Sequence, residues 1–204
     1  MTAHELALPP LMGLDIVDAK QIVRSEVRAR RSKMSDAEVA RFGEQFATQI
    51  MEFSAETTTV ALYVSTAHEP STMLALDLLR DNDVGVLLPK LGPGLNRMWA
   101  WYEGSDRLIV DAPGRPPSPD SEPLGPEAVE QVGCLIIPAL AIDRNGHRVG
   151  QGGGWYDRML KQNIDGIHTA AVVYPWELVS VDLPFDEMDR SVAHVILPDQ
   201  IVRL

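Results

Sequence analysis

Apolar residues recur at helical spacing near the start of the chain. In residues 16–31 they form one stripe, made up of Ile16, Ala19, Ile22, Val23 and Val27. This spacing predicts an amphipathic helix. Ser35 and Glu38 then stand three residues apart, a capping-box pattern that predicts a second helix running to about Phe53.

Farther along, short apolar and β-branched runs alternate with helical patterns. Buried strands are expected at residues 59–65, 84–91, 134–143, 168–174 and, as the last strand, 193–199. Two more strands, at 98–103 and 107–111, could pair as a hairpin. Helices are expected from Ser71 or Thr72 to Leu79, at 127–131 and at 155–163. Buried strands alternating with helices predict an α/β fold with a mostly parallel sheet.

A proline-rich segment interrupts this pattern. Residues 112–126 contain six prolines, which excludes a helix or a central strand. The segment could link two small domains, but we favour a long surface loop within one domain of 204 residues. Residues 1–17 are expected to form a poorly ordered extension before a single domain at 18–204.

Composition narrows the function. The formal net charge of −11 argues against a general nucleic-acid binder, although a local basic site for a small anion remains open. The single cysteine, Cys134, excludes an intramolecular disulfide, and no apolar run approaches the roughly 20 residues that span a bilayer. We expect a cytoplasmic monomer with small-molecule ligands and no nucleic-acid or membrane partner.

The densest chemical signal is RVGQGGGWYD, residues 148–157, where four glycines fall between Gly150 and Gly154. The segment follows a predicted strand and leads into a predicted helix, where backbone N–H groups often cradle phosphate. It is neither a Walker A loop nor a dinucleotide fingerprint. A glycine-rich hairpin is the alternative, but Arg148 could bind phosphate and Asp157 could hold Mg²⁺.

A second basic feature lies on the first helix. Lys20, Arg24 and Arg28 recur every four residues and form one cationic stripe, which could be a solvated face or could reach an anionic ligand. The five histidines show no zinc-like pairing, and the chain has no G-x-S-x-G elbow.

These residues carry a resemblance. IIPALAIDRNGHRVGQGGGWYDRML, residues 136–160, resembles the signature of the 5-formyltetrahydrofolate cyclo-ligase family, also called 5,10-methenyltetrahydrofolate synthetases. Shorter matches occur in the same order as in the family: Lys20-Gln-Ile-Val-Arg24, Glu69-Pro-Ser-Thr72, LLPK, Met98-Trp-Ala-Trp101 and Met188-Asp189. The departures are Ala139 for a glycine, Gln151 and Trp155 for tyrosines, Met188 for a histidine and Ala193 for an aspartate.

The resemblance implies a single-domain Rossmann-like three-layer α/β/α fold (NagB/RpiA/CoA transferase-like). It implies a ligase that uses ATP and Mg²⁺ to convert 5-formyltetrahydrofolate to 5,10-methenyltetrahydrofolate, through phosphorylation of the formyl oxygen and attack by N10. Two alternatives remain open: a catalytically silent paralogue that binds a ligand or RNA, and an ATP-dependent phosphotransferase that acts on another substrate.

By position, the resemblance assigns roles to specific residues. ATP would contact Lys20, Arg24, Arg148, Val149, Gly150, Gln151, Gly152, Gly153, Gly154, Trp155 and Tyr156. Lys20 and Arg148 would act in catalysis, and Asp157 and Asp189 would hold Mg²⁺. The folate would contact Val64, Glu69, Met98, Trp101 and Tyr156, although Met98 and Trp101 could equally be core residues.

Overall fold

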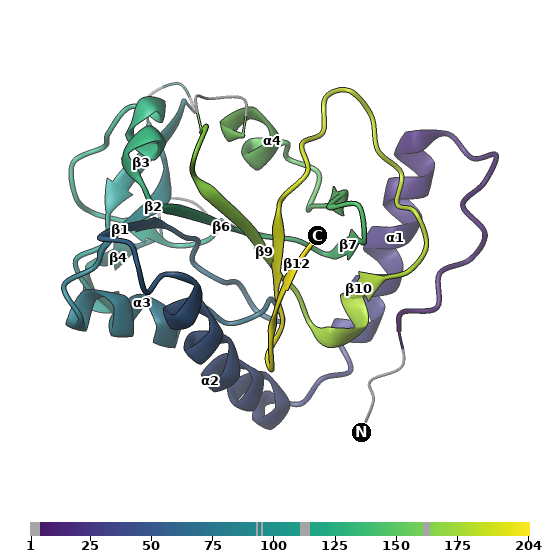
Figure 1. Ribbon diagram of the computed structural model, residues 1–204, viewed down its shortest axis with the longest axis horizontal. Coiled ribbons are helices and arrows are strands. Elements are labelled where there is room, and N and C mark those ends of the chain that lie inside the picture. The colour runs from purple at the N-terminus through teal and green to yellow at the C-terminus, as the bar shows by residue number, and fades with distance from the viewer. Residues whose placement is uncertain (1–4, 93, 95, 111–114, 161–163) are drawn as a thin grey trace.

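A seven-stranded sheet, in the order β12-β11-β9-β6-β1-β2-β3, forms the centre of the computed structural model (Figure 1). Its strands are β1 (Thr59–Ala61), β2 (Gly85–Leu91), β3 (Arg97–Trp101), β6 (Cys134–Pro138), β9 (His168–Val172), β11 (His194–Ile196) and β12 (Ile201–Arg203). The five inner strands run parallel, whereas β3 and β12 pair antiparallel at the edges. The structure describes residues 5–92, 94, 96–110, 115–160 and 164–204.

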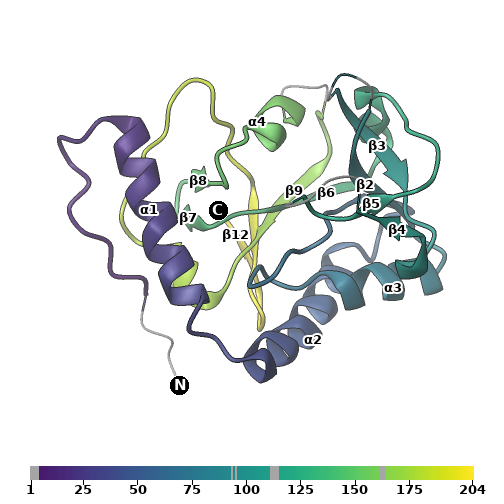
Figure 2. The ribbon, with the colours of Figure 1, turned by 180° about the vertical axis from the view of Figure 1, so that it is seen from behind.

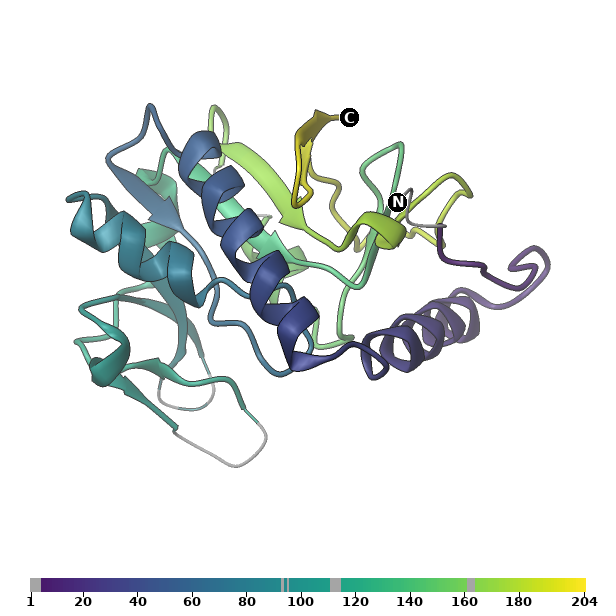
Figure 3. The ribbon, with the colours of Figure 1, turned by 90° about the horizontal axis from the view of Figure 1, so that it is seen from below.

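Helices cover both faces of this sheet. Helix α2 (Asp36–Phe53) and helix α3 (Met73–Asp81) lie side by side across one face, as Figure 3 shows. The short helices η3 (Pro126–Gln131) and α4 (Trp155–Met159) contribute to the core on the other. Successive residues of a strand point to opposite faces, so a strand covered on both needs a continuous apolar run. β6 has such a run, and its first four residues are buried.

A smaller, three-stranded sheet carries the first helix. It consists of β10 (Leu178–Val179), β7 (Ala141–Asp143) and β8 (Arg148–Val149). Helix α1 (Ile16–Arg31) buries Val23 and Val27 in the same apolar cluster as Ala141 and Val149. Figures 1 and 2 show α1 at one side of the molecule, apart from α2 and α3.

The segment before α1 contacts the same region. Leu6 is buried in the cluster beneath α1, and its N–H donates to the Trp176 carbonyl at 2.8 Å. Glu5 accepts hydrogen bonds from the backbone and side chain of Ser180. The helix itself begins at Ile16, inside the range expected as an extension. Within the residues described, no helix combines the length and apolar character needed to cross a membrane.

Several expectations are confirmed. The capping box at Ser35 and Glu38 is present, with both reciprocal hydrogen bonds, and α2 ends at Phe53 as expected. Cys134 is fully buried. The α/β class and the mostly parallel sheet are also confirmed, while the likeness to one particular superfamily stays a prediction.

Other expectations are wrong. The run 134–143 is not one strand, because the chain leaves the large sheet at Pro138 and enters the small one at Ala141. The expected hairpin does not form: β3 pairs with β2, and β4 (Leu108–Ile109) pairs with β5 (Ser118–Pro119). The last strand is β12, which follows the expected strand 193–199 and lies at the edge of the sheet. Helix α4 ends at Met159; residues 161–163 of the expected helix lie outside the described residues.

The strand order places a switch point between β1 and β6. From β1 the chain moves to β2, and from β6 it moves the opposite way to β9 and β11. Loops leaving the carboxyl ends of two such strands diverge and leave a crevice, where open α/β sheets bind ligands. Glu69 follows β1, and the glycine segment follows β6 by way of β7 and β8.

Candidate active site

Two adjoining cavities open at this switch point. The first, of about 320 Å³, is bounded by the glycine segment, α1 side chains and the loop at 186–189. The second, of about 590 Å³, is bounded by residues after β1, the end of β2 and the proline-rich loop. The two cavities share a wall formed by Glu69, Pro138, Gln151, Trp155 and Tyr156. A ligand in one cavity would therefore lie next to a ligand in the other.

Four glycines of the segment line the first cavity, and they fall into two pairs with different reasons for lacking a side chain. Gly152 and Gly154 have φ of +104° and +58°, a backbone region that favours glycine. Gly150 and Gly153 differ, because their φ is ordinary and a Cβ there would meet no atom within 4 Å. The fold itself does not require glycine at these two positions. The open space that they leave borders the cavity, as a backbone cradle for a ligand would need.

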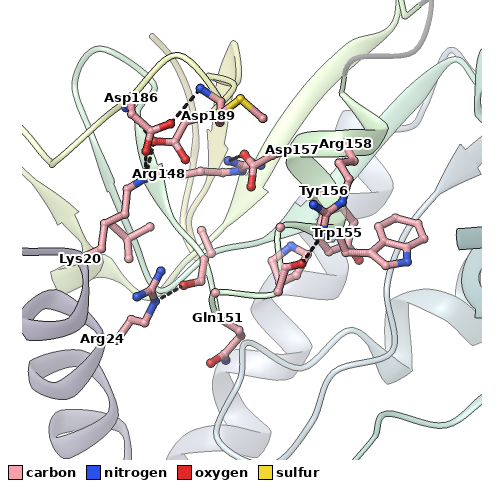
Figure 4. Close-up of a pocket in the computed structure, with 18 of the residues that line it drawn as sticks. Lys20, Arg24, Arg148, Gln151, Trp155, Tyr156, Asp157, Arg158, Asp186 and Asp189 are labelled. Carbon is pink, nitrogen blue, oxygen red and sulfur yellow. Dashed lines mark hydrogen bonds and ion pairs between the residues drawn. The ribbon is translucent and has the colours of Figure 1, made fainter. Parts of the chain in front are cut away.

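Cations from α1 reach this cradle. Arg24 donates from Nε to the Gly150 carbonyl oxygen at 2.9 Å. Lys20 Nζ lies between two carboxylates, 2.8 Å from Asp186 and 2.5 Å from Asp189, as Figure 4 shows. The Lys20 and Arg24 side chains leave α1 one turn apart on the same face, so the predicted cationic stripe does turn toward the glycine segment.

Arg148 and Asp157 form the third charged pair. Arg148 is buried and donates from both terminal nitrogens to one Asp157 oxygen, Oδ1, at 2.9 and 2.8 Å. It also donates to the Arg190 carbonyl. Bonding to a single oxygen leaves Asp157 Oδ2 unused by Arg148 and available to another ligand. Asp157 stands on α4 directly after the cradle.

Burial and neighbouring charges shift the pKa values of three cations that line the first cavity, where acidic side chains lie as well. Burial lowers the pKa of Arg24, and the neighbouring charge of Arg28 lowers it further. Burial also lowers the pKa of Arg148, although Asp157 acts in the opposite direction. Burial opposes the charge on Lys20, but Asp186 and Asp189 outweigh it and raise the pKa of Lys20. A bound anion would favour the charged forms of Arg24 and Arg148, the two whose pKa values are lowered.

The second cavity is more apolar than the first, and one carboxylate, that of Glu69, lies at the wall that the two cavities share. Its apolar lining comes from Tyr63, Val64, Pro89, Leu91, Pro116, Pro117, Trp155 and Tyr156. Glu69 is buried, and its Oε2 accepts from the Thr66 N–H at 2.8 Å. The Tyr174 hydroxyl holds the Glu69 carbonyl oxygen. A flat heterocycle with two adjacent N–H donors would suit such walls and such a carboxylate.

The structure gathers most of the predicted residues but not two of them. All the residues expected to bind ATP, together with Asp157 and Asp189, line the first cavity. Val64, Glu69 and Tyr156 line the second. Trp101 borders neither; it is 40% exposed and lines a separate hollow with Leu124. Met98 is also outside both linings, and its sulfur packs against Gly92.

Sequence reasoning missed residues on both sides of the site. Asp186 binds Lys20, and Arg158 lines the first cavity and donates to the Gly153 carbonyl oxygen. Lys90 binds the carbonyl oxygens of Pro119 and Ser121, which holds the proline-rich loop against β2. That loop was expected only to cover the surface, yet residues 115–118 form a wall of the second cavity. Asp186 could have been found from the sequence, because it stands three residues before Asp189 in the Met188-Asp189 match.

The acidic residues do not make a complete metal site by themselves. Within the described ranges, no three acid, histidine or cysteine side chains are gathered closely enough to hold an ion. Mg²⁺ in nucleotide sites commonly takes only one or two carboxylates, with substrate phosphates and water completing its shell. Asp157 and Asp189 at the rim of the cradle, with oxygen ligands only, are compatible with such a site.

Comparison with known proteins gives a consistent result. A model of the 5-formyltetrahydrofolate cyclo-ligase family matches residues 16–198. The chain is similar to the 5-formyltetrahydrofolate cyclo-ligase of Mycolicibacterium smegmatis, with 32% identity over 145 residues that cover 69% of this chain and 73% of the relative. The Escherichia coli protein of the same name is 29% identical over 181 residues, which cover 86% and 98% of the two chains.

Solved structures resemble the fold. The 5,10-methenyltetrahydrofolate synthetase of Aquifex aeolicus superposes with a TM-score of 0.75 at 26% identity, covering 90% of this chain and 92% of that one. The synthetase of Mycoplasma pneumoniae superposes with a TM-score of 0.67 at 19% identity, covering 87% and 97%. The second likeness concerns the fold alone. The family match begins at the first residue of α1, so it spans both cavities.

Proposed function

The chain belongs to the 5-formyltetrahydrofolate cyclo-ligase family, and we propose that it closes 5-formyltetrahydrofolate to 5,10-methenyltetrahydrofolate with consumption of ATP. The observation that carries this proposal is the shared wall between the two cavities. One cavity suits a polyphosphate and the other a flat reduced pterin. A phosphoryl group can pass between two substrates only if they meet, and the shared wall is where they would do so.

ATP would occupy the first cavity. Backbone N–H groups between Gly150 and Gly154 would surround its phosphates, and Lys20, Arg24 and Arg148 would neutralise them. In the structure Lys20 is bound to Asp186 and Asp189. We infer that Lys20 exchanges these partners for phosphate oxygens when ATP binds.

Mg²⁺ would be held by Asp157, through the oxygen that Arg148 does not use, and by Asp189. When bound, the ion neutralises phosphate charge and aligns the transferring phosphoryl group. Transfer of Lys20 from Asp189 to the nucleotide would free that carboxylate for the metal. Asp186 would stay beside Asp189, since its backbone N–H donates to an Asp189 carboxylate oxygen at 2.9 Å.

The reduced folate would occupy the second cavity, with its pterin on Glu69. A carboxylate can accept two parallel hydrogen bonds from the 2-amino group and ring N–H of a pterin. Val64 and Tyr156 would pack on the ring. Burial raises the pKa of Tyr156, so its hydroxyl stays protonated and can act as a neutral donor.

The chemistry requires positioning more than a covalent protein group. The formyl oxygen would attack the γ-phosphorus of ATP, releasing ADP and giving an iminium phosphate. N10 would then attack the formyl carbon and lose its proton, and the C–O bond would break to release phosphate. Arg148 and Lys20 would stabilise the transferring charge. No protein nucleophile takes part in this sequence.

A direct assay tests the proposal. Purified protein would be mixed with 5-formyltetrahydrofolate, ATP and Mg²⁺, and the absorbance of the methenyl product would be followed. We expect product only when all three are present, with one phosphate released for each ring closed. Folded protein that releases phosphate without ring closure would favour phosphorylation of another substrate. Folded protein with neither signal would contradict an enzymatic role.

A further inference from the structure

One side-chain amide joins the two cavities. Gln151 lies within the glycine segment and lines both of them. Its Nε2 donates to Glu69 Oε1 at 3.1 Å, and its Oε1 accepts from Arg28 Nη2 at 2.7 Å. A carboxylate accepts only and a guanidinium donates only, so these two neighbours fix which end of the amide faces each. Figure 4 shows the Gln151 side chain pointing away from the cluster of Lys20, Asp186 and Asp189.

The contacts form a continuous chain from α1 to the pterin carboxylate. Arg28 is the third member of the cationic stripe and lines neither cavity. Among the described residues, its link to Glu69 runs through Gln151. The Thr66 N–H holds the other oxygen of Glu69. Together, Thr66 and Gln151 set the plane in which Glu69 can receive a ligand, while each oxygen keeps a lone pair for that ligand.

The backbone of Gln151 belongs to the other cavity. On one side, the Gly150 carbonyl is held by Arg24; on the other, Gly152 adopts its positive φ. Phosphates bound by this backbone would therefore order the residue whose side chain orients Glu69. Gln151 and Arg28 are both exposed to solvent. Their hydrogen bonds then compete with water and hold Glu69 only weakly.

We propose that Gln151, supported by Arg28, is a positioning residue that couples the two substrate sites, so that nucleotide on the glycine segment tightens binding of the reduced folate. The inference rests on the proposed function. Ordering the segment on the nucleotide removes part of the entropy cost of holding the amide on Glu69. By thermodynamic reciprocity, the folate would tighten nucleotide binding by the same factor.

The test measures binding without turnover. Calorimetry would give the Kd of 5-formyltetrahydrofolate with and without a saturating non-hydrolysable ATP analogue and Mg²⁺. We expect the analogue to lower this Kd by roughly fivefold or more in the wild type. The coupling ratio is the folate Kd without the analogue divided by the Kd with it. In Gln151→Leu and in Arg28→Ala this ratio should be close to one. The double variant should fall no further, because both changes break one chain of contacts. Arg28→Lys, which keeps a donor, should retain most of the ratio.

Arg30→Ala is the matched control. It removes the same charge from the same helix, but Arg30 stacks over Trp176 instead of contacting Gln151, so the ratio should stay at its wild-type value. A wild-type ratio near one, or an unchanged ratio in Gln151→Leu, would overturn the coupling while ring closure in the turnover assay still supported the proposed function. Wild-type protein that binds no folate would overturn both.

Discussion

The two ends of α1 each carry a cation bound to carboxylates, and they differ in what surrounds the pair. Arg31, at the last residue of the helix, binds both oxygens of Glu177 at 2.7 and 2.8 Å and the Ala139 carbonyl at 2.9 Å. The Arg31 and Glu177 side chains are 4% and 0% exposed. Lys20, three turns earlier, binds Asp186 and Asp189 at the edge of an open cavity.

The difference separates a structural pair from an exchangeable one. Glu177 is also bound by the Tyr174 N–H, so the buried cluster leaves no position for a ligand. Burial opposes the charge on Arg31, but Glu177 outweighs it and raises the pKa of Arg31. If ATP and Mg²⁺ bind as we propose, they could replace the Lys20 pair without leaving a buried charge unpaired. One end of α1 is thus fixed in the core, and the other faces the open cavity in which we propose that ATP binds.

The largest expected effect is on the closed pair. Glu177→Gln removes the charge that compensates buried Arg31, and we expect the free energy of unfolding to fall by about 3–5 kcal/mol. Urea denaturation would measure it. In the same assay Lys20→Ala should lose no more than about 1 kcal/mol, since its partners are partly open to solvent. Equal losses in the two variants would abolish the distinction between the two ends.

The open pair should dominate activity instead. Lys20→Ala should lower kcat/KM for ATP by roughly 100-fold, because a cation aimed at the transferring phosphates is lost. Steady-state kinetics at saturating folate would measure this. The far-UV spectrum and thermal midpoint serve as the folding control. Wild-type kinetics in Lys20→Ala would remove Lys20 from the nucleotide site.

Two glycines offer the same contrast within the backbone. Gly146 has a φ of +81°, and a Cβ there would collide with the Val192 carbonyl oxygen. Gly146→Ala should therefore destabilise the fold by about 2 kcal/mol. Gly153→Ala should leave stability within about 0.5 kcal/mol but raise the KM for ATP by roughly tenfold, since the new methyl group fills space reserved for phosphate. If Gly153→Ala instead destabilised the fold and left the KM for ATP unchanged, the phosphate cradle would have to lie elsewhere.

Acid should weaken the open pair of Lys20 and Asp186. The hydrogen bond from Lys20 lowers the pKa of Asp186 below its usual value of 3.8, with a further contribution from the Met188 N–H. Its pairing therefore stabilises the fold above that pH and is lost as the pH falls through the lowered pKa. The stability difference between wild type and Lys20→Ala should be small and constant from about pH 5 to 8 and should shrink below about pH 4. A difference that grows in acid would contradict this pairing.

The smallest effect is expected at Trp101. Trp101 borders neither cavity, and Trp101→Ala should change the KM for folate by less than about twofold. Kinetics with varied 5-formyltetrahydrofolate would measure it, with Tyr156→Phe as a comparison inside the shared wall. A tenfold rise in the Trp101 variant would restore the original assignment of this residue to the pterin site.

Local signals predicted much of this architecture, and contacts between distant segments account for most of what was missed. The capping box at Ser35 and the density of glycine at 150–154 depend on neighbours in sequence, and both could be recognised directly. Asp186 meets Lys20 across 166 residues, so no local pattern links them. The break after Pro138 was hidden because residues 134–142 are all apolar, so no polar residue marks the end of the first strand.

The central claim is that ATP phosphorylates the formyl oxygen at the shared wall. The most direct measurement uses 5-formyltetrahydrofolate labelled with ¹⁸O in its formyl group, with ATP, Mg²⁺ and wild-type protein, followed by mass analysis of the released phosphate. Phosphate carrying one labelled oxygen for each ring closed is the predicted result. Ring closure with unlabelled phosphate and the label in water would contradict the claim.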